Sequence, residues 1–238
     1  MTNNWPMKSC FVGREKEIRK LTKALGKGRN AIVTGTYGIG RTRMIRRIAE
    51  TMRRKRRFVF VDFSKTAGEV CGQLLAIFRP KASSGRVVRN ARYRIGRNLL
   101  AGMRLPEGPK PVIVLDNIGR LTRQKLSFLR DLNMENRYLF VAVVESFLPE
   151  QSLFLLRACL FPSETIPIRH LTCKDAQSFF QSVAVTYGLS LTKADLAVLA
   201  QVSGGYPLGM RETAERLVKR DAEKTDWVPP ELQDDPWK

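Results

Sequence analysis

The chain has 238 residues, 43% of them hydrophobic, which suffices for one large domain or for a core domain with a small second one. Four scattered cysteines fit neither a disulfide framework nor a metal site. No apolar run reaches the roughly 18 residues of a transmembrane helix, and the first residues lack the apolar core of a secretory signal. We therefore expect a cytoplasmic protein that does not associate with membranes.

The net charge of +20 comes from one half of the sequence. Residues 1–110 contain 27 Lys or Arg against 6 Asp or Glu, whereas residues 111–238 contain 15 against 16. Such asymmetry favours contact with a polyanion, most often nucleic acid. A solvated basic face is the alternative.

Short apolar runs alternate with helical patterns along most of the chain. Strands are predicted at 30–35, 58–63, 112–115, 138–146 and 165–168. Residues 11–28 are predicted to form a turn followed by an amphipathic helix, and further helices are predicted at 42–54, 70–78, 122–132 and 151–159. This alternation predicts an α/β fold with a parallel sheet flanked by helices. After His170 only helical patterns follow, at 172–187, 192–202 and 208–220, and they predict a small helical lid domain before an irregular acidic tail.

The stretch GTYGIGRT, residues 35–42, fits the phosphate-binding loop pattern G-x-x-x-x-G-K-[ST] except that Arg41 replaces the lysine. A strand, a glycine-rich turn and a helix start direct backbone N–H groups at a phosphate, although an ordinary strand-to-helix turn is the alternative. The apolar strand VIVLDN ends in Asp116, where phosphate-loop NTPases place an aspartate that supports magnesium. Capping of the next turn is the alternative role for Asp116.

With these motifs the chain resembles the AAA+ P-loop ATPases, especially the origin-recognition-like and STAND-type branch. The resemblance rests on FVGREKEIRKL, GTYGIGRT, VIVLDN, IPIRHLTCKDA and SGGYPLGMRETAERL, and it spans about residues 10 to 220. It implies an N-terminal segment and helix at 1–28, an ATPase core at 29–170 with a basic insertion near 79–106, a helical lid at 171–222 and an irregular tail at 223–238.

The resemblance also implies ATP and Mg²⁺ as ligands. The implied nucleotide-binding positions are Val12, Gly13, Arg14, Gly35, Thr36, Tyr37, Gly38, Ile39, Gly40, Arg41, Thr42, Arg43 and Arg211. Thr42 and Asp116 would serve the magnesium, and the catalytic candidates are Asp116, Asn117 and Glu145, with Ser146 beside them. Arg157 would reach a neighbour's nucleotide in a ring or filament. A solvated helix charge is an equal alternative for Arg211.

Two positions depart from the family pattern. Arginine at 41 keeps the charge of lysine but is bulkier and forked. Asn117 stands where a second acid orients the attacking water, and an amide cannot act as a base. We therefore expect nucleotide binding with weak or absent hydrolysis. An active ATPase switch or motor, with Glu145 as a substitute base, and a nucleotide-free scaffold remain alternatives.

Basic residues form two groups in the first half. One is RRKRR at 53–57; the other lies within 70–106, which contains no acid. A helix from Ser84 would place Arg86, Arg89, Arg97 and Arg104 on one face and Val88, Ala91, Ile95 and Leu99 on the opposite, packed face. The predicted nucleic-acid-binding residues are Arg53, Arg54, Lys55, Arg56, Arg57, Arg86, Arg89, Arg97 and Arg104.

Few aromatic residues interleave these charges, so duplex backbone contact is favoured over single-strand stacking. A solvated face, a membrane-surface helix and, for RRKRR, a nuclear-localisation signal are the alternatives. A protein of this kind is expected to self-assemble or to regulate a protein partner on DNA, and to lie on the nucleoid if it is bacterial.

Overall fold

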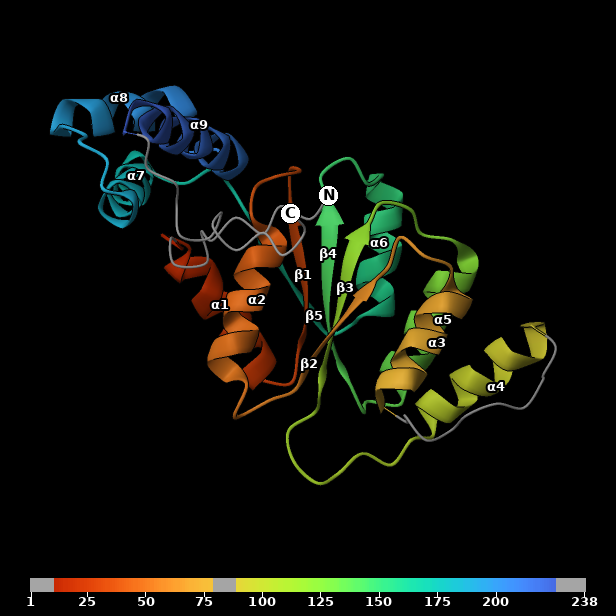
Figure 1. The fold of residues 1–238 in the computed structure, drawn as a ribbon. Coiled ribbons are helices and arrows are strands. Elements are labelled where there is room, and N and C mark those ends of the chain that lie inside the picture. Colours follow the sequence, from red (N-terminus) through yellow and green to blue (C-terminus); the bar gives the residue numbers. More distant parts are fainter. Residues whose placement is uncertain (1–10, 79–88, 226–238) are drawn as a thin grey trace, which may run out of the picture. The chain divides into compact units, whose positions relative to one another are not determined.

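The computed structural model describes residues 11–78 and 89–225 (Figure 1). The chain divides into two compact units. Among the described residues, the sheet unit comprises 15–37, 41–78 and 89–168, and the lid unit comprises 11–14, 38–40 and 169–225. None of the described helices is both long enough and apolar enough to cross a bilayer.

The sheet unit contains five parallel strands in the order β2-β3-β4-β1-β5 (Figure 1). The strands are β1 (Asn30–Gly35), β2 (Phe58–Asp62), β3 (Val112–Ile118), β4 (Leu139–Glu145) and β5 (Ser163–Pro167). Each is followed or preceded by a helix, as parallel connections require. The predicted α/β class, a parallel sheet flanked by helices, is confirmed.

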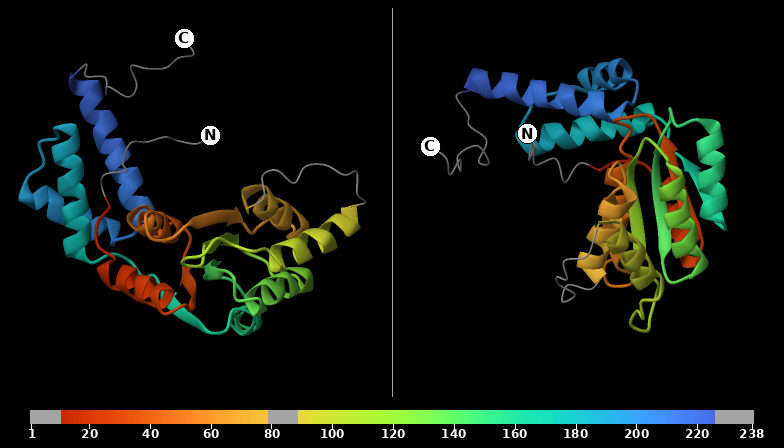
Figure 2. Two further views of the ribbon diagram at one scale, coloured as in Figure 1. Left: turned by 90° about the horizontal axis from the view of Figure 1, so that it is seen from below. Right: turned by 90° about the vertical axis from the view of Figure 1, so that its right-hand side faces the viewer.

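Helices cover both faces of this sheet (Figures 1 and 2). The helices are α1 (Glu15–Gly26), α2 (Arg41–Met52), α3 (Ala67–Phe78), α4 (Arg89–Ala101), α5 (Arg123–Met134) and α6 (Glu150–Cys159). One buried cluster joins α3, α5 and α6 to alternate strand residues such as Ile113 and Phe140. α1 and α2 contact β1 through their own buried residues, among them Leu25 and Ile45. Because both faces are covered, the three central strands β1, β3 and β4 are nearly continuous apolar runs.

A network of two amide side chains joins β1 to its surroundings. Asn30, at the start of β1, is 3% exposed, and its Nδ2 donates to Asn133 Oδ1 and to the Leu160 carbonyl, each at 2.8 Å. The Phe140 N–H donates to Asn30 Oδ1, also at 2.8 Å. Asn133 Nδ2 in turn donates to the carbonyls of Cys159 and Phe161. The network fixes β1 against β4, α5 and the end of α6.

The pairing of β3 with β4 is interrupted just where the acidic end of β3 begins. The regular register holds to Leu115 and resumes at Ile118, and Asn117 between them has φ 59°. On its other side β3 stays in register with β2, so that Asp116 pairs with Asp62. An irregularity of this kind re-aims side chains at the end of a strand.

The lid unit contains three helices, α7 (Cys173–Tyr187), α8 (Lys193–Ser203) and α9 (Pro207–Thr225). α7 and α8 both begin with a capping box, Thr172 with Asp175 and Thr192 with Asp195. Buried apolar residues of all three helices, such as Phe180, Ala200 and Met210, form the core of this unit.

Helix α4 presents a different face from the one predicted. Ile95 and Leu99, expected to pack inward, are 49% and 39% exposed. Gly96 faces α3 instead, where a Cβ would lie 2.8 Å from Leu75 Cδ1, so the absence of a side chain lets the helices approach. Arg97, on the same inward side, pairs with Asp131 at 3.0 Å and is not part of an exposed basic face.

The other members of that predicted face are also separated. Arg86 and Val88 lie outside the described residues, as does the predicted helix start at Ser84. Arg104 follows the end of α4 at Ala101 and is exposed. Arg89 begins the helix as the structure has it.

Candidate nucleotide site and basic surface

The glycine-rich loop turns sharply between β1 and α2. β1 ends at Gly35, α2 begins at Arg41, and Gly38 and Gly40 have φ +72° and +90°, conformations that favour glycine. A Cβ at Gly38 would approach Leu208 Cβ to 2.8 Å within the lid unit. Backbone and helix start thus have the form that a phosphate-binding loop requires.

Thr42 and Asp116 lie in contact although 74 positions separate them. The Thr42 hydroxyl donates to Asp116 Oδ1 at 2.9 Å. Thr42 is in the first turn of α2, and Asp116 is near the carboxyl end of β3. A hydroxyl and a carboxylate are the hard oxygen ligands that Mg²⁺ prefers, so the two residues fit the magnesium of a bound nucleotide. No cluster of three metal-ligating side chains exists among the described residues.

The Arg41 guanidinium is held by the end of β4. It forms an ion pair with Glu145 and donates to the carbonyl oxygen of Val144. The side chains of Arg41 and Glu145 are only 7% and 15% exposed. The register explains the meeting, because Gly35 at the end of β1 pairs with Glu145 in the neighbouring strand. Arg41, one of the two residues that depart from the family pattern, therefore engages Glu145, the candidate substitute base.

Asn117 contacts an acid that the sequence analysis did not select. Its Nδ2 donates to Asp62 Oδ1 at 3.3 Å, and Asp62 ends β2. Hydrogen bonds from Ser64 hold the pKa of the Asp62 carboxyl below its usual value. A signal was present in the sequence, since FVFVD and VIVLD both end in aspartate. The acid lies at the same end of the sheet as Asp116.

A second residue that the sequence analysis missed is Lys125 in α5. It is 5% exposed, and its Nζ donates to the Phe63 carbonyl at 2.6 Å and lies 5.1 Å from the centre of the Phe63 ring. Burial lowers the pKa of the Lys125 ammonium. The lysine thereby anchors the segment that follows Asp62. No motif marks it, because its carbonyl partners are distant in the chain.

The segment predicted near the adenine belongs to the lid unit. Val12 packs against the lid core, and Gly13 lies close to Leu171 and Asp175. Arg14 is 8% exposed and donates to the carbonyls of Arg169 and Ile39. Arg211 in α9 pairs with Glu215 on the same helix, with 3.2 Å between Nε and Oε1.

The remaining loop and strand-end residues differ in exposure. Thr36 and Tyr37 are exposed, Tyr37 by 73%, whereas Ile39 is buried and Arg43 is half-buried. The N–H of Ser146 donates to the Gly35 carbonyl at 3.2 Å and continues the pairing of β4 with β1. Arg157, in the last turn of α6, is exposed.

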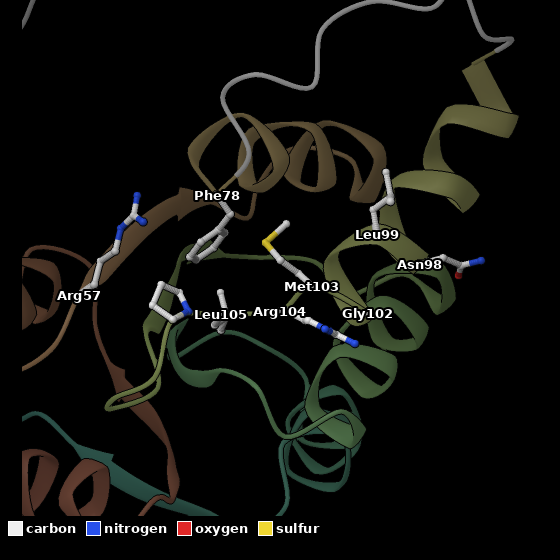
Figure 3. A pocket seen from close by; sticks show the side chains of 9 residues that line it. Arg57, Phe78, Asn98, Leu99, Gly102, Met103, Arg104 and Leu105 are labelled. Carbon is white, nitrogen blue, oxygen red and sulfur yellow. The ribbon is translucent and has the colours of Figure 1, made fainter.

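The basic cluster, defined as Arg53, Arg54, Lys55, Arg56 and Arg57, follows α2. The first three are exposed, while Arg56 is half-buried, donates to the Lys110 carbonyl at 3.1 Å and has a pKa lowered by burial. Arg57 lines a pocket together with Arg104 (Figure 3). The structure thus brings together one member of each basic group, which the sequence could not reveal.

Sheet order, glycine loop and the Thr42–Asp116 contact define a P-loop nucleotide-binding fold. The family model described as the AAA ATPase domain matches residues 10–144, more than half of the chain. The chain belongs to this AAA ATPase family, as the motifs predicted. A comparison with curated proteins finds no match.

Solved structures with the same fold include a Cdc6p, an Orc1 and a RuvB protein. Cdc6p from Pyrobaculum aerophilum has a TM-score of 0.67 and 16% identity over 92% of this chain and 65% of its own. The Aeropyrum pernix Orc1 protein in complex with DNA has a TM-score of 0.54 and 16% identity, covering 92% and 69%. The Thermotoga maritima RuvB Holliday junction branch migration motor has a TM-score of 0.57 and 17% identity over 93% of this chain and 67% of its own. This chain therefore spans about two thirds of each.

Proposed function

We propose that the protein binds ATP with Mg²⁺, hydrolyses it weakly or not at all, and contacts the DNA backbone through its basic surface. Nucleotide binding then controls self-assembly or a protein partner on the DNA. A cytoplasmic location, on the nucleoid if the source is bacterial, goes with this function. The observation that carries the proposal is the conjunction of two contacts at the glycine loop, Thr42 with Asp116 and Arg41 with Glu145.

The first contact supports nucleotide binding. A magnesium ion that accompanies ATP finds a hydroxyl and a carboxylate already adjacent, 2.9 Å apart, next to a helix start whose N–H groups and dipole favour phosphate. When bound, the nucleotide supplies the phosphoryl group and its metal. The chain's own residues position the phosphates through the backbone of residues 35–42 and hold the metal through Thr42 and Asp116.

The second contact supports weak hydrolysis. Glu145, the candidate substitute base, is held in an ion pair with Arg41, so this carboxylate is directed to the guanidinium and not to an attacking water. Asn117 cannot accept a proton from water, and its amide is directed to Asp62. The two departures from the family pattern thus act together: Arg41 pairs with Glu145, the candidate substitute base, and Asn117 stands where the family places its second acid.

The basic cluster supports DNA contact. Arg53, Arg54 and Lys55 are exposed on one connection, and Arg46 and Arg47 extend the exposed charge along α2. Exposed Lys and Arg residues gain affinity for a duplex by releasing its counterions, independently of base sequence. The Orc1 structure that shares this fold was determined in complex with DNA, and RuvB is described as a Holliday junction motor.

The surface around α6 supports self-association. Phe147 and Phe161 flank the helix and are 70% and 76% exposed, and Phe154 within it is 66% exposed. Large apolar side chains gathered on a monomer's surface mark protein contacts. Arg157 lies in the same helix and is exposed, so a subunit that docks through α6 brings this arginine to its neighbour.

A titration of Mg²⁺–ATP into the purified protein, with and without a blunt duplex, tests the proposal. We expect that the protein binds ATP, that the duplex increases its affinity for ATP, and that little phosphate is released in the same samples. Steady phosphate release that disappears in Asp116→Ala would refute weak hydrolysis and show that the protein is an active ATPase. If ATP leaves the melting temperature, the assembly state and the DNA affinity unchanged, nucleotide binding is refuted and the nucleotide-free scaffold is supported.

A further inference from the structure

A pocket of about 530 Å³ opens in the sheet unit beside the ends of α3 and α4 (Figure 3). Its apolar lining consists of Phe78, Leu99, Met103, Leu105 and Pro106. Figure 3 labels Phe78, Met103 and Leu105 among the side chains that line it. The volume lies within the range of roughly 300–1,000 Å³ that small-ligand pockets occupy.

Two cations, Arg57 and Arg104, line this apolar pocket, and no acid among the described residues pairs with either. The Arg57 guanidinium lies 5.1 Å from the centre of the Phe78 ring and donates to the Ile77 carbonyl at 3.2 Å, which fixes its position. Arg104 is exposed. Neither forms an ion pair with a residue in 11–78 or 89–225. Like charges beside an apolar surface favour a ligand with an anionic group and an apolar body.

We propose that this pocket binds one unpaired nucleotide of a DNA strand whose duplex part lies on the basic cluster. The inference rests on the DNA contact proposed above, because Arg57 is both the last member of that cluster and part of the pocket lining. The base packs on the apolar lining beside the Arg57 guanidinium, since unstacked bases pack on guanidinium planes as they do on aromatic rings. The phosphate that follows meets Arg104.

The same lining predicts little preference among the four bases. Asn98 is the one uncharged side chain in the lining that offers hydrogen bonds, and the other contacts are apolar or cationic. Packing on a base face is tolerant of sequence, because every base has such a face. The pocket is therefore expected to distinguish an unpaired nucleotide from a paired one, and to recognise the end or a bulge of a duplex.

The test compares affinity of the full chain for a blunt duplex, for the same duplex with a single-base bulge, and for free thymidine monophosphate. A 2-aminopurine in the bulge reports packing of the base by fluorescence. Leu99→Glu adds an acid to the pocket, and Ile95→Glu adds the same charge one turn earlier on α4 at an exposed position outside it. Arg104→Ala, with exposed Arg94→Ala as its control, repeats the comparison without adding an acid.

The unaltered protein is expected to prefer the bulged duplex by about tenfold, as the packing of a single base provides. Leu99→Glu and Arg104→Ala should remove that preference and the 2-aminopurine signal, whereas Ile95→Glu and Arg94→Ala should keep both. Equal affinity for blunt and bulged duplexes would overturn the pocket assignment while the backbone contact stands. If the protein binds free thymidine monophosphate more tightly than bulged DNA and Leu99→Glu abolishes that binding, the ligand of the pocket is a free nucleotide and not part of a DNA strand. Failure to bind any DNA would refute both proposals, and binding of bulged DNA alone would support the pocket against the duplex contact.

Discussion

Replacing Glu145 by Gln tests whether the ion pair with Arg41 restrains nucleotide binding. In the structure the Arg41 guanidinium donates to Glu145 and to the Val144 carbonyl, and only 7% of its side chain is exposed. A guanidinium that turns to a phosphate has to leave both partners. A hydrogen bond between charged groups contributes about 1.5–3 kcal/mol. Because Glu145 retains some exposure, we take the lower part of this range, about 1.5–2 kcal/mol.

Glu145→Gln removes most of that cost, so we expect ATP affinity to rise about ten- to thirtyfold. The same change leaves Arg41 without its counter-charge when no nucleotide is bound. The free energy of unfolding should then fall by about 1.5–2 kcal/mol, which lowers the melting temperature by about 3–8 °C in a chain of this size. Calorimetric titration with a non-hydrolysable ATP analogue and thermal unfolding measure the two effects.

Asp62→Asn is the matched control for Glu145→Gln. It also removes a carboxylate at the carboxyl end of a strand in the same sheet, but Asp62 bonds Ser64 and Asn117 and not Arg41. A gain in affinity of equal size in both variants would be a general charge effect and would refute the restraint. When Arg41→Ala is already present, Glu145→Gln should no longer raise ATP affinity, because such a double-mutant cycle measures the interaction between the two side chains.

Four further outcomes are expected. Asp116→Ala should abolish the magnesium-dependent part of ATP binding and spare the rest, measured by titration with Mg²⁺ and with a chelator. Arg53→Glu should weaken duplex binding, and the plot of log affinity against log salt should become shallower by about 0.9 for each phosphate that the variant no longer neutralises. Burial raises the pKa of the Cys71 thiol to about 11, so at pH 8 an alkylating reagent should label exposed Cys173 and leave Cys71 protonated and unlabelled until the protein unfolds. Thr172→Ala removes the cap of α7 and should cost about 1 kcal/mol of stability, seen in thermal unfolding.

Much of the fold could be predicted because the central strands β1, β3 and β4 are buried on both sides. Such strands are continuous apolar runs, and the runs ending at Gly35 and Asp116 lie where the structure has β1 and β3. The face of α4 could not be predicted in this way. Apolar and basic residues both recur at helical spacing in α4. The side of the helix that packs inward is the one with Gly96, which lies close to α3, and the sequence of α4 alone does not reveal this tertiary contact.

The candidate site was predictable residue by residue but not as a set of contacts. Arg41 and Glu145 were both singled out, yet nothing local to either links a loop residue to a strand end more than a hundred positions away. Their meeting depends on the register that pairs Gly35 with Glu145. The role of Lys125 could not be predicted for the same reason, because the Phe63 and Ser64 carbonyls that it contacts belong to a distant segment. The convergence of Arg57 and Arg104 likewise needed the packing of α3 against α4.

The strand order has a consequence for how copies of this chain can meet. β2 and β5 are the edges of the sheet, and an open edge invites a foreign strand to add to it. Here both edge strands have five residues; β5 ends in Pro167, which has no N–H to offer, and β2 directly follows the basic cluster. Repulsion between those charges and the missing donor oppose β-augmentation and amyloid-like stacking. The self-association proposed above would then use side-chain surfaces, whose contacts salt and ligands can weaken or strengthen.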